Sequence, residues 1–173
     1  MRTTGDPTRS LVKKAAVVFA VIAALSAVLS TPASAHHVRN HFKERRHIEH
    51  RARKVTGSPY RYGGSSPRGF DCSGFTRWTY RRHGATLPHS SSQQFSMGKR
   101  RGHKRIWRRA RLEPGDLVFH KTTSARVGHV GIYIGKGKFI SATSSEGVRV
   151  RSLYDSYWGP RWVGATRVPA VQR

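Results

Sequence analysis

The chain has 173 residues, and its 33 Lys and Arg residues against 8 Asp and Glu residues give a formal net charge of +25. This length suits one folded domain, and the charge favours polyanionic partners such as nucleic acid, anionic wall polymers or anionic lipid surfaces. The single cysteine excludes an internal disulfide framework, so the domain depends on its core alone.

The first 35 residues have the organisation of a secretory signal peptide. Four Lys and Arg residues precede an apolar stretch at residues 15–29, and Ala33-Ser34-Ala35 offers a small-residue cleavage site. We expect cleavage after Ala35 and a secreted or cell-envelope location, extracellular or periplasmic. The apolar stretch is short for a bilayer span, and no later stretch is apolar enough to cross a membrane. Without this leader, which holds four basic residues and one acid, the net charge is +22.

Residues 36–47 read as a basic, His-rich N-terminal arm, and residues 48–173 read as one domain. Five of the ten histidines lie between positions 36 and 50, but no Cys or acidic cluster completes a metal site, so we expect no metal there. Ile48, Ala52 and Val55 recur at helical spacing and predict a short amphipathic helix.

A loop rich in Gly and Pro follows at residues 57–71, and a helix of about three turns is expected after it. Asp71 is a good N-cap for this helix, and Gly84 is a good stop, so Cys72 falls in the first helical turn. Residues 87–98 form a polar loop with room for one helical turn.

The second half of the chain predicts antiparallel strands. These are residues 116–120, a hairpin over residues 129–143, a strand within residues 146–153 and a last strand within residues 157–168. Helices followed by short strands indicate an α+β fold in which the helices pack on one side of an antiparallel sheet.

Cys72 is the first candidate for chemistry. A thiol at a helix start lies where backbone N–H groups favour the thiolate, which lowers the pKa of reactive cysteines. Gly69 and Gly74 flank it and leave room for a substrate backbone. A buried structural cysteine is the competing interpretation, and this stretch alone does not separate the two.

A cysteine nucleophile needs a base, and a histidine is the usual one. His129 fits best, because it begins a strand after a Gly-containing loop. His120, at the end of the neighbouring strand, is its competitor.

Five blocks in this order and spacing together resemble the NlpC-type cysteine peptidases of bacterial cell walls. The similarity covers about residues 48–168, and the blocks are PYRYGGSSPRGFDCSGFTRWTY, LPHSSSQQ, PGDLVFH, GHVGIYIGKGKFISATSSEGV and YWGPRWVGATRV. The resemblance implies a reduced papain-like fold, in which the nucleophile-bearing helix packs on an antiparallel sheet that carries the histidine. It implies no cofactor.

The same resemblance assigns roles to individual residues. Cys72 matches the nucleophile and His129 the general base. Tyr60 matches a tyrosine whose hydroxyl helps to bind the oxyanion, and a core aromatic is the alternative for it. Asp71 and Ser73 match residues that hold the free amine of the wall stem peptide, although Asp71 can also be the helix cap.

The family usually has a third polar residue, most often another His, twelve positions after the base. Here that position is Ser141, which is the main departure from the family pattern. Ser141 shares a sheet face with His129 only if the hairpin loop holds an odd number of residues, and a two-residue turn would point it away. Direct cross-strand pairing would place Ser144 or Ser145 opposite His129, depending on the length of that loop, so Thr143 and Ser145 are alternative partners.

The resemblance implies a secreted cysteine peptidase that hydrolyses peptidoglycan stem peptides at the γ-D-glutamyl–diamino acid bond through a thioester. An amidase or acyl transferase on the same scaffold is an alternative. A catalytically weak, cationic module that binds wall polymer is another, since the basic run at residues 99–111 suits anionic polymers. We expect a monomer. We also expect no binding to nucleic acid, because the protein is expected to be exported and has few aromatic residues that could stack on bases.

Overall fold

The computed structural model describes residues 32–169, and the chain divides into two units, residues 1–40 and residues 41–173. The described part of the first unit, residues 32–40, belongs to helix α2 (Pro32–Arg53), which continues into the second unit. Most of the expected signal peptide lies outside the described residues, so cleavage after Ala35 stays a prediction.

Helix α2 contains the predicted amphipathic segment but begins much earlier than predicted. Ile48, Ala52 and Val55 are buried, as their spacing indicated. The preceding residues are helical as well, so the backbone of the expected arm is helical and not irregular. One feature of the sequence explains the longer helix: no Gly or Pro interrupts residues 33–56.

The second unit contains a six-stranded antiparallel sheet with strand order β3-β8-β4-β5-β6-β7. Its strands are β3 (Lys104–Ile106), β4 (Leu117–His120), β5 (His129–Gly135), β6 (Lys138–Thr143), β7 (Gly147–Ser152) and β8 (Trp162–Arg167). The sheet confirms the predicted α+β class. The sequence did not reveal β3 or the 3₁₀ turn η2 (Arg109–Arg111), since both lie within the basic run.

Shorter elements lie around the sheet. Strands β1 (Ser65–Ser66) and β2 (Gly69–Phe70) form a small hairpin inside the predicted loop. Helix α3 (Cys72–Arg81) begins at the cysteine, as predicted. Helix α4 (Ser91–Ser96) forms the expected single helical turn after the N-cap Ser90, and the 3₁₀ turn η1 (Met97–Lys99) extends it.

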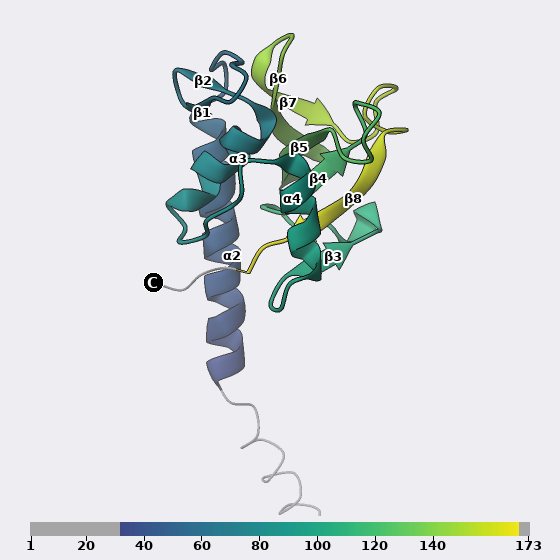
Figure 1. Ribbon diagram of the computed structural model, residues 1–173. Helices are drawn as coiled ribbons and strands as arrows, with labels where there is room; N and C mark the ends of the chain where they lie inside the picture. The colour runs from purple at the N-terminus through teal and green to yellow at the C-terminus, as the bar shows by residue number, and fades with distance from the viewer. Residues whose placement is uncertain (1–31, 170–173) are drawn as a thin grey trace, which may run out of the picture. The chain divides into compact units, whose positions relative to one another are not determined.

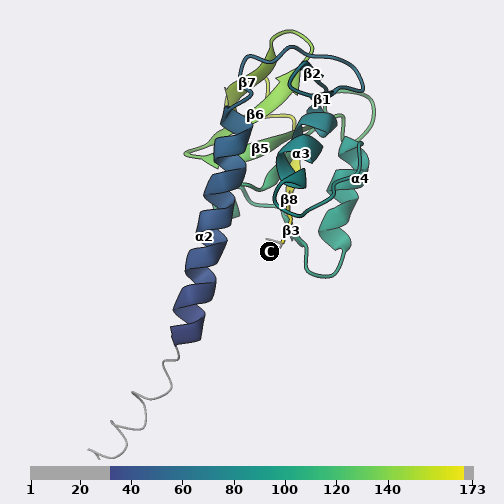
Figure 2. The same cartoon turned by 90° about the vertical axis from the view of Figure 1, so that its left-hand side faces the viewer.

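The two faces of the sheet are buried by different parts of the chain. Helix α3 packs its Phe75 on one face, among Val130, Ile132 and Ile140, and Figures 1 and 2 show α3 and α4 on this side. The other face carries a smaller core in which Phe139 packs with Trp158 and other apolar side chains. The side chains of alternate residues therefore enter two separate cores.

The β5–β6 hairpin decides which residues share a face with His129. Its turn is the two-residue Lys136-Gly137, with φ of 51° and 68°, which suits a type I′ turn. The register then shifts by one residue between Tyr133 and Gly135, so that Ile132 pairs with Ile140. The expectation that a two-residue turn would point Ser141 away is wrong, because this bulge returns Ser141 to the sheet face that carries His129.

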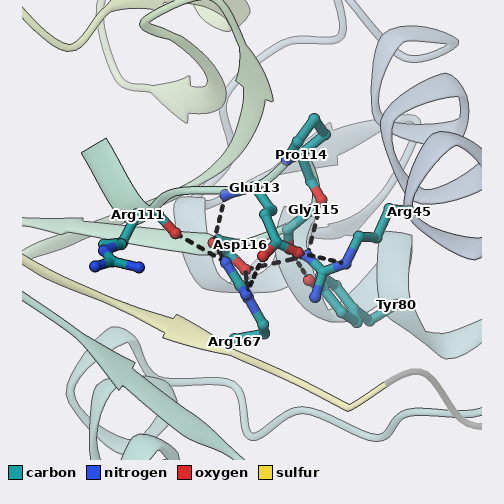
Figure 3. Close-up of polar contacts among 8 residues, drawn as sticks. All are labelled: Arg45, Tyr80, Arg111, Glu113, Pro114, Gly115, Asp116 and Arg167. Carbon is teal, nitrogen blue, oxygen red and sulfur yellow. Dashed lines mark hydrogen bonds and ion pairs between the residues drawn. The ribbon is translucent and has the colours of Figure 1, made fainter. Parts of the chain in front are cut away.

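A polar network holds the C-terminal half of α2 to the sheet (Figure 3). The fully buried Asp116 carboxylate accepts hydrogen bonds from Arg45 Nη1 at 3.2 Å and from Arg167 Nε and Nη2, both at 2.9 Å. Glu113 pairs with both arginines, and the Tyr80 hydroxyl donates to the Gly115 carbonyl oxygen. Because each charge has an opposite partner, this burial is compatible with a stable core.

Candidate active site

Cys72 is the first residue of α3, and Asp71 caps the helix as predicted. Asp71 has extended backbone geometry, and its Oδ1 accepts a hydrogen bond from the Gly74 backbone N–H at 2.6 Å. A side chain at Gly74 has no space, since a Cβ there would lie 2.0 Å from the Gly64 carbonyl oxygen. A Cβ at Gly69 would lie 2.7 Å from Arg61 Cβ. The space beside the two glycines is therefore filled by residues 61 and 64 of the protein itself. The expectation that the glycines leave room for substrate is wrong.

The thiol of Cys72 is protonated near neutral pH. Burial raises the pKa of Cys72 to about 11, a hydrogen bond from the Val130 backbone offsets only part of this, and the Asp71 carboxylate adds to the rise. The lowered pKa expected from the helix start is therefore wrong for this site without substrate, because desolvation of the thiolate outweighs the helix N-terminus. The cysteine needs a base to become a nucleophile.

His129 begins β5 and pairs directly with His120 of β4. Its ring lies against the indole of Trp158, with the ring centres 4.8 Å apart. Burial lowers the pKa of His129 to about 4, and the positive charge of Arg151 contributes. His129 is therefore neutral near pH 7 and can accept a proton, as a general base must.

Cys72 and His129 line the same open cavity of about 620 Å³. Tyr60, Thr143 and Arg151 are among the other residues that line it, and Trp158 closes one side. No hydrogen bond joins Cys72 to His129 within residues 41–169, and such contacts in free enzymes often tighten only when substrate binds. The fold thus brings the predicted nucleophile and the predicted base to one cavity from elements far apart in sequence.

A second cavity, of about 410 Å³, is also lined by the cysteine. It shares Tyr60, Cys72 and Gly128 with the first cavity, and Asp71 and Ser73 are among its other lining residues. An extended peptide that enters both cavities would therefore pass Cys72. The arrangement suits cleavage within a chain, with one part of the substrate on each side of the thiol.

Tyr60 lies where the resemblance placed it. It lines both cavities, and its backbone forms an isolated bridge with Phe70. Burial raises the pKa of the Tyr60 hydroxyl, and the nearby Cys72 and Asp71 add to this effect. The hydroxyl therefore stays protonated and can donate a hydrogen bond, and the oxyanion role of Tyr60 stays a prediction.

Asp71 and Ser73 lie together in the second cavity, with a partner that sequence reasoning missed. Ser73 Oγ donates to Asp71 Oδ1 at 2.9 Å, and Oδ2 accepts from the Gly63 backbone N–H at 3.0 Å. The ring nitrogen Nε2 of His89 also lies 2.9 Å from Oδ2. Asp71 thus serves as a helix cap and still presents a carboxylate to the cavity. The position of His89 in the block LPHSSSQQ was the available signal for it.

Ser141 is buried on the same face as His129, but the expected hydrogen bond between them is absent. Ser141 Oγ and His129 Nε2 have no hydrogen-bond partner among the described residues. The strand register explains this, since a Cβ at Gly131 would lie 3.0 Å from Ser141 Cβ, so Ser141 lies opposite Gly131 and is diagonal to His129.

The alternative partners do not bind the imidazole either. Thr143 lines the first cavity and accepts a hydrogen bond from Arg151 Nη2 at 3.3 Å. Ser144 and Ser145 line the same cavity in the loop after β6, and so neither lies opposite His129 in the sheet. If the pairing of Ile132 with Ile140 is continued along the two strands, Thr143 is the residue that lies opposite His129.

Metal ligands do not cluster within the described residues: no group of three or more His, Cys, Asp and Glu side chains there could hold an ion. In the same part of the chain, no helix combines the length and the apolar character needed to cross a membrane.

Comparison with known proteins agrees with the site. The family model described as the NlpC/P60 family matches residues 57–167. The γ-DL-glutamyl hydrolase of Bacillus subtilis (strain 168) is 39% identical over 119 residues, which cover 67% of this chain and 27% of that protein. The murein DD-endopeptidase MepS/murein LD-carboxypeptidase of Escherichia coli (strain K12) is 42% identical over 113 residues, 65% of this chain and 56% of that one.

Among solved structures, the NlpC/P60 domain of the peptidoglycan hydrolase SagA superposes with a TM-score of 0.59 at 30% identity. The match covers 72% of this chain and 98% of that one. The chain spans about a quarter and about half of the two curated relatives named above, so the shared region is the domain that contains Cys72 and His129. The fold, the placement of the two residues and the family match over residues 57–167 agree, and the chain belongs to the NlpC/P60 family.

Proposed function

We propose that the protein is a cell-wall cysteine peptidase that hydrolyses peptidoglycan stem peptides. The observation that carries this proposal is the convergence of a buried thiol and a neutral imidazole on one cavity, with a tyrosine hydroxyl beside them. The relatives' names, which describe γ-glutamyl and murein hydrolysis, point to the same class of substrate.

The proposed reaction begins when His129 removes the proton from the Cys72 thiol and the sulfur attacks the scissile carbonyl carbon. The carbonyl oxygen becomes an oxyanion, which the Cys72 backbone N–H and the Tyr60 hydroxyl stabilise by hydrogen bonds. The protonated His129 then donates its proton to the leaving nitrogen, the C–N bond breaks, and a thioester forms. His129 next removes a proton from water, which attacks the thioester and regenerates the thiol.

The finer proposal is that the bond cleaved joins γ-D-glutamate to the following diamino acid. His129 must protonate the leaving amine, so the leaving part of the substrate belongs in the first cavity with His129. The other part, with its free amine, then belongs in the second cavity, where the Asp71 carboxylate can pair with an ammonium group. The name of the Bacillus subtilis relative supports this γ-bond, whereas the Escherichia coli relative's name describes other bonds.

Fragment masses test both levels of the proposal. Isolated peptidoglycan incubated with the purified protein should release peptides that end in γ-D-glutamate, and new free amines should form on the diamino acid. A Cys72→Ala variant should release none. Fragments from a D,D or other bond would refute the finer proposal alone. Equal release by the wild type and the Cys72→Ala variant would show that Cys72 is not the nucleophile. An amidase would free whole stem peptides, and an acyl transferase would need an added amine acceptor.

A second candidate function is a wall-binding module with little hydrolysis. Two observations favour it: no hydrogen bond joins Ser141 to His129 among the described residues, and the net charge without the expected leader is +22. Wall binding without fragments from the wild type would support this alternative. We also propose export, and N-terminal sequencing of protein from the cell envelope or medium should then find His36 first.

A further inference from the structure

Four buried polar atoms without a hydrogen-bond partner lie on the sheet face that carries His129. They are both ring nitrogens of His120, Nε2 of His129 and Oγ of Ser141. The described residues contain seven such atoms, so more than half of them belong to this one cluster. Because an unpaired buried polar group destabilises the folded state, a cluster of them calls for an explanation other than stability.

Three adjacent strands contribute to the cluster. His120 of β4 and His129 of β5 are direct cross-strand partners, with their ring centres 6.4 Å apart. Ser141 of β6 lies on the same face, opposite Gly131 and diagonal to His129. The three side chains therefore face a common region behind the catalytic imidazole, on the side away from the solvent.

The surroundings of the cluster are largely aromatic. The His120 ring stacks on Phe139 at 4.9 Å and meets the edge of Trp158 at 5.0 Å. Burial is the main cause that lowers the pKa of both imidazoles, to about 4 for His129 and about 3 for His120. The positive charge of Arg151 adds to the effect on His129, and His129 and then Arg109 add to the effect on His120. Both rings are therefore neutral, and no hydrogen bond from a described residue reaches the four polar atoms of the cluster.

The ring separation decides how they interact. A direct N–H···N hydrogen bond of about 2.9 Å would bring the two ring centres to about 5 Å, which is shorter than the observed 6.4 Å. One water between two ring nitrogens fits the larger separation, and a buried water commonly has two to four polar partners. We propose that His120 is a positioning residue for His129 and acts through a buried water that Ser141 also binds.

The hydrogen-bond directions follow from the proposed role of His129 as the base that removes the Cys72 proton, so this step rests on the proposed function. His129 Nε2–H donates to the water oxygen, and the water donates to a nitrogen of His120 and to Ser141 Oγ. This arrangement satisfies three of the four atoms. It keeps the proton of neutral His129 on Nε2, so Nδ1 is free to accept the thiol proton of Cys72. His120 thus supplies the orienting function that the family usually places at the position of Ser141.

Replacement of the ring tests the proposal in the full chain. His120→Phe keeps an aromatic ring on Phe139 and removes both nitrogens. We expect kcat for peptidoglycan fragments to fall about 10- to 100-fold, by analogy with the loss when a partner that orients a metal-ligating histidine is removed. KM should change less than twofold, because His120 lines neither cavity. His120→Gln, which retains a polar acceptor, should recover part of kcat. His83→Phe is the matched control, since His83 Nε2 is also buried and unpaired but lies beyond the far end of α3.

A second measurement needs neither a variant nor activity. Nitrogen-15 NMR of labelled histidines at pH 7 should find His129 of the wild type protonated on Nε2, and His120→Phe should weaken this preference. Protonation on Nδ1 in the wild type would overturn the proposal even if His120→Phe failed to fold. Unchanged kcat in a folded His120→Phe variant would overturn it as well. Failure of the wild type to release fragments would count against the proposed function, while the tautomer would still test the role of His120.

Discussion

Asp71 Oδ1 lies 2.6 Å from the Gly74 backbone nitrogen, so the residue that precedes the candidate nucleophile also caps its helix. The same carboxylate accepts a hydrogen bond from Ser73 Oγ and contacts the ring of His89. Asp71 thus stabilises the helix and is also the residue proposed to bind the substrate amine, and choosing the replacement separates the two contributions.

Asp71→Asn should retain the cap, because Asn and Asp are similar in this position, whereas Asp71→Ala should lower the free energy of unfolding by about 1 kcal/mol. Both variants remove the charge proposed to bind the substrate amine, so both should raise KM for stem peptides with a free N-terminus. Urea unfolding and steady-state kinetics measure the two effects. If KM rises only for Asp71→Ala, the carboxylate does not bind the amine.

The thiol of Cys72 should react slowly with iodoacetamide at neutral pH. Its pKa is raised to about 11, mainly by burial, so the thiolate fraction should grow with pH up to that value. The negative charge of Asp71 contributes to the rise, so Asp71→Asn should move the alkylation profile to lower pH. Mass spectrometry after timed alkylation at several pH values provides the profile. A midpoint below pH 8 in the wild type would show that a thiolate–imidazolium pair forms without substrate.

The basic run at residues 99–111 should contribute to wall binding through its exposed members only. Arg105 lies over the Phe95 ring at 3.4 Å, and Arg109 donates to the Gly159 carbonyl oxygen, so these two residues are structural. Lys99, Arg100 and Arg101 are exposed. Replacing these three with Gln should weaken pelleting with purified walls, and 0.5 M salt should weaken it in the wild type, since salt screens exposed charges. Wall binding that stays the same in the Gln variant and in 0.5 M salt would exclude an electrostatic mechanism.

Much of the fold followed from local sequence patterns. The helix that begins at Cys72, the β5–β6 hairpin and the burial of Ile48 were predicted because caps, turns and apolar spacing act over a few residues. Strand β3 was missed because its packing depends on β8, more than fifty residues away, and its own residues look like a solvated basic run.

The site shows the same division between local and distant effects. Cys72 and His129 could be chosen from their places at element starts and from the family resemblance. Their pKa values could not, because burial by the rest of the fold outweighs the local helix end. The position of Ser141 depended on a bulge within the hairpin, and the unpaired nitrogens of His120 depend on the pairing of β4 with β5.

Acid should destabilise the fold through two buried imidazoles. The folded-state pKa values of His129 and His120 are lowered from 6.5 to about 4 and about 3, chiefly by burial. As pH falls below 6.5, the unfolded chain takes up protons that the folded chain does not, so stability is lost until the folded-state values are reached. Each group contributes at most about 1.4 kcal/mol per pH unit. Urea unfolding between pH 7 and pH 4 should show the loss, and His120→Phe should reduce its slope.

The buried Asp116 should be among the most sensitive positions of the second unit. Asp116→Asn leaves Arg45 and Arg167 without their shared carboxylate, and breaking a buried ion pair typically costs about 3–5 kcal/mol. Glu49→Gln is the matched control, because it breaks the exposed pair with Arg53, which is worth about 0.3–0.5 kcal/mol. Denaturant unfolding of both variants measures the contrast. A similar loss in both variants would mean that Asp116 does not hold α2 to the sheet through these arginines.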